Sequence, residues 1–240
     1  MAPRPSTTPQ RILVVAAHPD DIDFGVAGSV AHWTEQGIEV AYCIATDGDA
    51  GGSDPSVSRV DMARLRREEQ AAAAACVGVD DLTFLGHPDG RLTSGLELRR
   101  DLTRVIRRVR PQRVVFPSPE RSYTRIFASH PDHLAAGEAT LCAVYPDSRN
   151  PFAHPELLAE GLEPHTVEEV WMMAFPTPDT WVDVTDQFER KVSALRCHRS
   201  QVGGWEDLER AMRQWGEATA RQGGLPEGRL AEAFRAISTV

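Results

Sequence analysis

Apolar residues along the chain gather in short runs that alternate with longer amphipathic segments. The first run, residues 11–17 (RILVVAA), is continuous and of strand length, which is typical of a strand buried on both faces of a parallel sheet. The next segment, residues 25–36, has a helical pattern and is closed by Gly37 as a helix C-cap. The same patterns predict further strands at residues 38–46, 82–85, 113–116, 169–174 and, at a sheet edge, 181–184. They predict further helices at residues 59–77, 96–109, 131–145, 186–199 and about 206–221.

Strands and helices that alternate in this rhythm form βαβ units. They predict an α/β fold with a mostly parallel sheet between two helix layers, followed by C-terminal helices. We expect residues 1–10 to be a disordered tail and residues 11–240 to form a single domain. The proline-rich stretch 147–166 is predicted to be a long loop within that domain, because strand signals resume after it.

Composition and charge exclude several classes of protein. No stretch approaches the ~18 uncharged apolar residues that a membrane helix needs. The net charge of −9, from 26 basic and 35 acidic residues, argues against a nucleic-acid partner, whose phosphates require clustered positive charge. The four cysteines form no CxxC pair and lie in apolar runs, as expected for reduced thiols in a cytoplasmic protein. The first ten residues lack the apolar core of a signal peptide, which supports the same expectation.

Two short acidic and imidazole-rich clusters follow strands of the predicted sheet. The first strand runs into residues 17–21 (AHPDD), and the segment after the fourth strand ends in residues 130–133 (HPDH). In an open α/β sheet, ligands bind outside the carboxyl ends of the strands at the topological switch point. Strands 1 and 4 are neighbours there in the usual doubly wound order, so we expect the two clusters to face each other across one crevice.

A crevice lined by several carboxylates and imidazoles is stable only when a cation joins them. Two histidines and one carboxylate with an open coordination position make a catalytic zinc site, and Fe(II) suits the same donors. Three residues are assigned as ligands: His18, Asp21 and His133. His130 lies on the same side of the predicted helix start as His133, so either histidine could reach the ion. Asp20 is expected beside the metal, and Asp132 behind it as an acceptor for an imidazole N–H. The alternative is two polar turns in which Asp20 or Asp21 only caps a helix.

The motifs AHPDD and HPDH together resemble the PIG-L/LmbE-like family of metal-dependent N-deacetylases. The resemblance covers about residues 10–202 and extends to weaker motifs. These are Thr46-Asp47-Gly48 with Gly51-Gly52, Arg66 and Glu69 before an alanine-rich stretch, Phe84-Leu85-Gly86 with Asp89-Gly90, and Lys191 with His198-Arg199-Ser200-Gln201.

The resemblance implies a Rossmann-like three-layer sandwich without a dinucleotide, a single zinc ion, and hydrolysis of an N-acyl amine, usually an N-acetylglucosaminyl group. His18, Asp21 and His133 would be the zinc ligands by motif position. Asp20 would be the general base, and His130 would stabilise the oxyanion or protonate the leaving amine, with Asp132 completing the catalytic set.

The same resemblance makes Arg66 and Asp89 candidates for binding substrate hydroxyls. Asp89 lies in a glycine-rich segment that also reads as a simple turn. His198 either packs within the protein or lines the substrate pocket, and the resemblance favours the pocket.

Two other functions fit part of this pattern. One is an amidase that cleaves a larger N-acyl chain, from a thiol conjugate or an antibiotic. The other is a non-catalytic metal- or sugar-binding module, against which Asp20 and His130 argue, because neither is needed to hold a metal. The expected partner is a small N-acylated sugar or conjugate, and assembly into a homo-oligomer is compatible with this class of enzyme.

Overall fold

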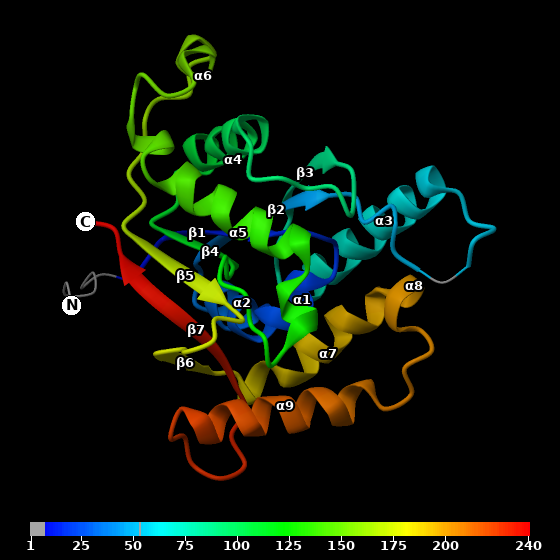
Figure 1. The fold of residues 1–240 in the computed structure, drawn as a ribbon. Helices are drawn as coiled ribbons and strands as arrows, with labels where there is room; N and C mark the ends of the chain where they lie inside the picture. The colour runs from blue at the N-terminus through cyan, green and yellow to red at the C-terminus, as the bar shows by residue number, and fades with distance from the viewer. Residues whose placement is uncertain (1–7, 53) are drawn as a thin grey trace.

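Short apolar runs build the centre of the molecule, because a strand buried on both faces has no polar side to present to water. The computed structural model describes residues 8–52 and 54–240, and these form a seven-stranded sheet in the order β3-β2-β1-β4-β5-β7-β6 (Figure 1). Its strands are β1 (Arg11–Ala16), β2 (Glu39–Thr46), β3 (Asp81–His87), β4 (Arg113–Pro117), β5 (Glu169–Met173), β6 (Thr180–Asp183) and β7 (Ala231–Ser238). The strands β1 to β5 pair in parallel, so the predicted mostly parallel α/β fold is confirmed.

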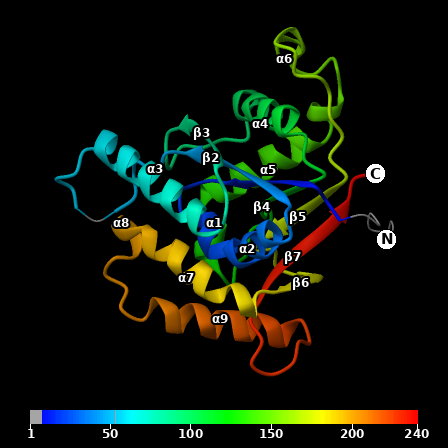
Figure 2. The same cartoon turned by 180° about the vertical axis from the view of Figure 1, so that it is seen from behind.

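Helices cover both faces of the sheet and enclose two separate apolar cores. On one face, α2 (Ala27–Glu35), α3 (Arg59–Cys76) and α7 (Phe188–Cys197) pack on alternate residues of β1 and β2 (Figure 2). On the other face, α4 (Leu96–Val109) and α5 (Pro131–Val144) pack on the residues between them. A smaller cluster joins α7 to α8 (Arg199–Val202) and α9 (Leu208–Gln222). The three-layer arrangement with additional C-terminal helices is therefore as predicted.

Several predicted elements differ from those observed. The helix predicted at residues 25–36 begins earlier and is broken: α1 (Asp21–Gly25) and α2 are separated by Val26, whose φ of −147° is not helical. The stretch 147–166 is not wholly irregular, because it contains the turns η2 (Asp147–Arg149) and α6 (Pro155–Ala159). The helix predicted at 186–199 starts as η3 (Thr185–Gln187) and ends before His198. A further short turn, η1 (Ile126–Ser129), precedes α5.

The strand β7 was not predicted from the sequence, and it changes the sheet edge. It lies antiparallel between β5 and β6, so that β6, predicted correctly as an edge strand, joins the sheet through β7. Residues 1–7 of the predicted tail lie outside the described residues.

Two further expectations concern the thiols and the membrane. None of the four cysteines forms a disulfide, although the Sγ atoms of Cys76 and Cys197 lie 3.8 Å apart. Within residues 8–52 and 54–240, no helix is both long and apolar enough to cross a membrane.

Candidate metal centre and active site

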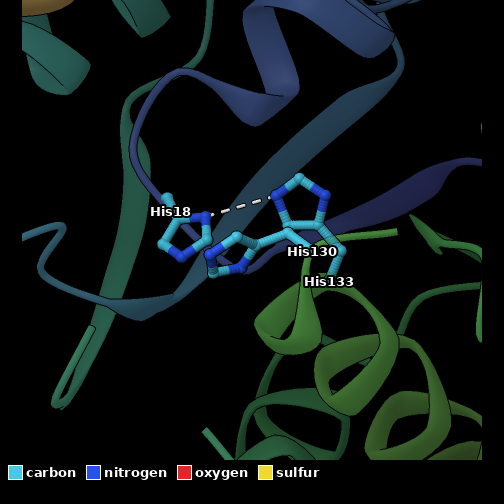
Figure 3. Close-up of side chains that lie close together, drawn as sticks. All are labelled: His18, His130 and His133. Atoms are coloured by element: carbon cyan, nitrogen blue, oxygen red, sulfur yellow. Dashed lines mark hydrogen bonds between the residues drawn. The ribbon is translucent and has the colours of Figure 1, made fainter. Parts of the chain in front are cut away.

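The two polar clusters meet where β1 and β4 end side by side. His18 lies in the turn after β1, while His130 and His133 lie at the start of α5, and Figure 3 shows the three rings grouped together. Pro131 begins α5, and His130 is its N-cap, because its Nδ1 accepts a hydrogen bond of 3.2 Å from the Asp132 backbone N–H. The two clusters therefore meet at neighbouring strand ends, as predicted.

The spacing of donor atoms on three residues fits a metal ion. His18 Nδ1 lies 3.3 Å from His133 Nε2 and 3.5 Å from Asp21 Oδ2, and His133 Nε2 lies 3.0 Å from Asp21 Oδ1. With zinc–ligand distances of about 2.0–2.2 Å, neighbouring donors of a tetrahedral site lie roughly 3.3–3.5 Å apart. The structure therefore brings the predicted ligands His18, Asp21 and His133 to distances at which they could share one ion.

His130 lies close to the same point. The rings of His18 and His130 have centroids 5.0 Å apart, and the side chains of His18, His130 and His133 offer nitrogen atoms within 4.8 Å of one another. Since the Nδ1 of His130 already accepts the capping hydrogen bond, only its Nε2 is available to the crevice. The ring is also exposed, so its Nε2 can meet a ligand from solvent.

Two carboxylates lie behind His18 and fix its orientation. The Nε2 atom of His18 is 3.2 Å from Asp132 Oδ2 and 3.1 Å from Asp89 Oδ1. Asp132 also accepts hydrogen bonds from the backbone N–H groups of Gly90 (2.7 Å) and Leu92 (3.1 Å). A carboxylate at Nε2 places the imidazole proton there and leaves the Nδ1 lone pair for a metal. Asp132 thus occupies the supporting position predicted for it.

Asp89 belongs to the site, but its side chain faces His18 and is only 8% exposed. It also accepts a hydrogen bond of 3.2 Å from the Ala50 backbone N–H, while its own N–H donates to Asp49. The predicted contact of Asp89 with substrate hydroxyls is therefore replaced in this structure by contacts with protein groups.

The acidic groups around His18 make the site electrostatically suited to a cation. Burial alone would lower the pKa of His18, but hydrogen bonds with Asp132, Asp21 and Asp89 raise it to about 12. Burial would likewise raise the pKa of Asp21, yet the charge of His133 and hydrogen bonds with both histidines hold it well below its usual range. The carboxylates therefore stay ionised beside the histidines, and their negative charge favours a cation in this cluster.

Asp20 lies beside this cluster in an unusual backbone conformation, with φ 94° and ψ −29°. Its Oδ2 atom is 3.1 Å from Arg66 Nη2, and its backbone N–H donates to Gln70 Oε1 at 2.9 Å. Burial and the charge of Asp21 raise the pKa of Asp20 to about 6, against the opposing charge of Arg66. A carboxyl group with this pKa is suited to general base catalysis near neutral pH.

Arg66 was predicted to hold substrate, but the structure directs its guanidinium to the protein. The side chain is buried, and it donates to the carbonyl oxygens of Gly48 and Pro19 as well as pairing with Asp20. A Cβ atom at Gly48 or Gly51 would lie 2.3 or 2.5 Å from Arg66 Nη1. Gly48 and Gly51 thus leave room for the arginine, which passes directly against their backbone.

His198 does not line the pocket, contrary to the prediction. Its side chain is fully buried, and its Nε2 lies 2.7 Å from Asp23 Oδ2. Asp23 in turn accepts a hydrogen bond of 2.9 Å from Gln70 Nε2. Neither Asp23 nor Gln70 was predicted as a site residue, although an acid two residues after a predicted ligand and a glutamine in an alanine-rich helix were visible signals.

Comparison with known proteins gives the same result as this geometry. Residues 13–144 match the PIG-L family, described as GlcNAc-PI de-N-acetylase. The chain belongs to the PIG-L family. It is 35% identical over 192 residues to the diacetylchitobiose deacetylase of Thermococcus kodakarensis, covering 80% of this chain and 70% of that relative.

Other members of the PIG-L family support the assignment along most of the chain. A probable N-acetyl-α-D-glucosaminyl L-malate deacetylase 2 of Bacillus cereus is 30% identical over 200 residues, which cover 80% of this chain and 84% of the relative. Among solved structures, the N,N'-diacetylchitobiose deacetylase of Pyrococcus horikoshii in complex with an inhibitor superposes with a TM-score of 0.87 at 32% identity. That alignment covers 95% of this chain and 84% of the other. The mixed sheet with helices on both sides is therefore the fold of this family.

Proposed function

We propose that this member of the PIG-L family is a metal-dependent hydrolase that removes an N-acetyl group from an amino-sugar conjugate. The observation that carries the proposal is the set of donor atoms on His18, Asp21 and His133, with two acid–base groups, Asp20 and His130, beside it. A protein that only held a metal would need neither. The deacetylase names of its relatives support the reaction and the class of sugar.

The metal proposed for the site is zinc, held by His18 Nδ1, Asp21 and His133 Nε2. Bound there, zinc would supply Lewis acidity, which polarises an amide carbonyl and makes water more acidic. Fe(II) suits the same two imidazoles and one carboxylate. Asp132 keeps the His18 ring in the orientation that binding requires, through its contact with Nε2.

Asp20 is proposed as the general base. Its carboxylate is held by Arg66, and its pKa of about 6 leaves it ionised at neutral pH, ready to take a proton from the attacking water. The same carboxyl group then carries a proton that it can give to the leaving nitrogen, which must be protonated before the amine departs. We therefore assign both proton transfers to Asp20.

His130 is proposed to stabilise the oxyanion of the tetrahedral intermediate. Because its Nδ1 accepts from the Asp132 backbone, a neutral His130 ring carries its proton on Nε2. Partial burial and the charge of His18 lower the pKa of His130, which favours this neutral form. The Nε2–H group is then a donor that faces the crevice and can bind developing negative charge.

The substrate is proposed to be a small conjugate of N-acetylglucosamine handled in the cytoplasm, where the four free cysteines would remain reduced. The loop after β2 contacts Asp89 through Asp49 and Ala50, and the segment after β4 leads into His130, so specificity for the rest of the conjugate would lie in these two segments.

The proposal is tested by measuring acetate and free amine released from N,N'-diacetylchitobiose and other N-acetylglucosamine conjugates by the zinc-loaded protein. Asp20→Asn should retain about one zinc per chain and lose roughly 10²–10⁴-fold in kcat. His18→Ala should lose both zinc and activity. Asp80→Asn, a change at an exposed carboxylate before β3, is the matched control and should have no effect.

Three outcomes would contradict the proposal in different ways. Wild-type kcat in Asp20→Asn would remove Asp20 from the base role. Release of a long acyl chain but never of acetate would favour the wider amidase function. Zinc bound without release of any amine would favour a non-catalytic binding module.

A further inference from the structure

The carbonyl oxygen and the N–H group of the peptide bond between Pro19 and Asp20 both form hydrogen bonds with side chains of one helix, α3. Arg66 Nη2 donates to the Pro19 carbonyl oxygen, and Gln70 Oε1 accepts from the Asp20 N–H at 2.9 Å. Arg66 and Gln70 are four residues apart on α3, so they lie on the same face of the helix. Both side chains are buried. The orientation of this peptide plane is thus determined by α3 rather than by its own turn.

This hold matters because Asp20 adopts a conformation that its side chain disfavours. A φ of 94° lies in the left-handed region, which residues other than glycine occupy only when surrounding contacts impose it. The conformation is also the one that turns the Asp20 carboxylate toward Arg66, while the next residue, Asp21, faces His133. Two consecutive carboxylates can serve different functions only if the backbone between them is turned sharply.

Gln70 can accept from Asp20 only if its amide points in one direction, and Asp23 sets that direction. The carboxylate of Asp23 is an acceptor, so it attracts the Gln70 Nε2–H at 2.9 Å and leaves Oε1 facing the Asp20 N–H. His198 Nε2 lies 2.7 Å from the same Asp23 oxygen. The other Asp23 oxygen has no partner among the described residues, so both contacts converge on Oδ2. The result is a buried chain from His198 through Asp23 and Gln70 to Asp20.

We propose that Gln70, with its amide oriented by Asp23 and His198, is a positioning residue that holds the Asp20 backbone in the conformation required for its carboxylate to act. This inference rests on the proposed role of Asp20, but the hydrogen-bonded chain can be tested apart from that role. It assigns a function to the buried His198, which lies too deep to contact substrate.

The first test uses a readout that is independent of activity. Hydrogen exchange of the Asp20 backbone amide is followed by nuclear magnetic resonance, in the zinc-loaded protein and again after chelation. Gln70→Leu should speed exchange of this amide by about tenfold or more, because its acceptor is gone. Gln187→Leu, which removes a buried glutamine that donates to Glu35 outside the site, is the matched control and should leave Asp20 exchange unchanged. Unchanged exchange in Gln70→Leu would overturn the proposal.

The second test separates positioning from general packing. Gln70→Leu should lower kcat by roughly 10–100-fold with KM and zinc content nearly unchanged, since misplacement of a catalytic group affects the chemical step. In an Asp20→Asn background the same change should cost less than about twofold, because there is no base left to position. Equal losses in the two backgrounds would show a merely structural effect and would overturn the proposal.

The third test reverses the donor and the acceptor in the hydrogen bond between Gln70 and Asp23. It replaces the first two tests if Gln70→Leu does not fold. Gln70→Glu keeps an acceptor for Asp20 but places a second carboxylate against Asp23, so kcat should fall and Asp20 exchange should rise. Adding Asp23→Asn restores a donor–acceptor pair in the opposite sense. His198 can adjust its tautomer, because its Nδ1 has no partner among the described residues. The kcat of the double variant should be at least about tenfold higher than that of Gln70→Glu alone.

Absence of recovery in kcat and in Asp20 exchange would count against the orienting role of Asp23. If the wild-type protein releases no amine from any substrate, the proposed function fails, and the exchange measurements alone then decide whether Gln70 holds Asp20.

Discussion

At the level of single residues, Asp20 and Asp21 are adjacent carboxyl groups whose pKa values are shifted in opposite directions. Asp21 contacts His133 and His18, and its pKa is lowered despite burial. Asp20 has a pKa raised by burial and by the charge of Asp21, and the opposing charge of Arg66 lies in direct contact with it. One residue is thereby suited to bind a metal and the next to exchange a proton.

This balance predicts the pH dependence of the reaction. Asp20 acts as a base only when ionised, so kcat should be full above its pKa and fall as the pH drops through it. Arg66→Met removes the charge that lowers this pKa, and the acid limb of the kcat profile should move to higher pH. Loading with zinc should lower the acid limb of the kcat profile in the wild type and in Arg66→Met alike. The effect of Arg66 is therefore the difference in pH between the two acid limbs.

The matched control for this pH profile is Arg67→Met, which removes the neighbouring arginine that pairs with Asp47. Its acid limb should coincide with that of the wild type. An acid limb that stays in place in Arg66→Met would show that another group limits the reaction at low pH.

The sequence was informative about residues that act within a few positions of each other and uninformative about those that act through distant partners. His18 and Asp21 stand in one short motif and His130 and His133 in another, and the usual strand order of an open α/β sheet was enough to bring the two motifs together. Gln70 resembles a surface residue of an alanine-rich helix, and its partner Asp20 is 50 positions away. Arg66 and His198 were noticed, but only the packed structure shows that their side chains face inward.

At the level of elements, the site depends on how closely α5 approaches the end of β4. A Cβ atom at Gly137 would lie 2.3 Å from the Pro117 carbonyl oxygen and 2.9 Å from the Pro119 nitrogen. Gly137 follows His133 by one helical turn, so any displacement there moves the start of α5 as well. The absence of a side chain at this position allows His133 to reach the strand ends.

Gly137→Ala should therefore push α5 away from β4. We expect the free energy of unfolding to fall by about 1–3 kcal/mol, as for overpacked cores, and zinc affinity to weaken with it. Urea unfolding and zinc titration measure the two effects. Gly204→Ala, where an added Cβ meets nothing within 4 Å, is the control and should change neither. Unaltered zinc affinity in Gly137→Ala would show that α5 adjusts without moving His133.

The element that the sequence did not predict, β7, lacks a distinctive local signal. Its residues mix small, apolar and charged side chains without a regular alternation (AEAFRAIS), and three of the eight are alanines. The pattern does not indicate that the strand enters the sheet between β5 and β6. That position depends on pairing with β5, which lies more than 60 residues earlier in the chain. A local sequence pattern cannot predict such a distant pairing. The parallel strands, by contrast, were predictable because most of them, such as β1, contain a continuous apolar run.

At the level of the whole molecule, one buried ion pair joins elements from both ends of the chain. Lys191 Nζ of α7 lies 2.5 Å from Glu232 Oε1 of β7 and donates to the Phe24 carbonyl oxygen at the end of α1. Glu232 also accepts from the N–H groups of Gly28 (3.0 Å) and Ser29 (2.7 Å), which are free donors in the first turn of α2. The helices beside the metal site are thereby connected to the last strand of the sheet.

Glu232→Leu should leave the Lys191 ammonium buried without its partner and the first turn of α2 uncapped. A loss of about 3–5 kcal/mol in the free energy of unfolding is expected, which urea or thermal unfolding measures. Glu209→Leu removes an exposed carboxylate that pairs with Arg196, and it should cost no more than ~1 kcal/mol. Similar losses in the two variants would mean that the buried pair contributes no more than a surface pair.

The place of β7 also has a consequence for the order of events during synthesis on the ribosome. Chains fold from the N-terminus as they emerge, and every residue of the metal centre lies between positions 18 and 133. That centre can assemble on the five parallel strands while α7 is still being translated. β6, however, can join the sheet only after β7 has been made, and 47 residues separate the two strands. Asp23 likewise gains its contact with His198 only after α7 has been translated. A nascent chain could thus complete the proposed metal site well before the backbone of Asp20, the proposed base, is held by its buried partners.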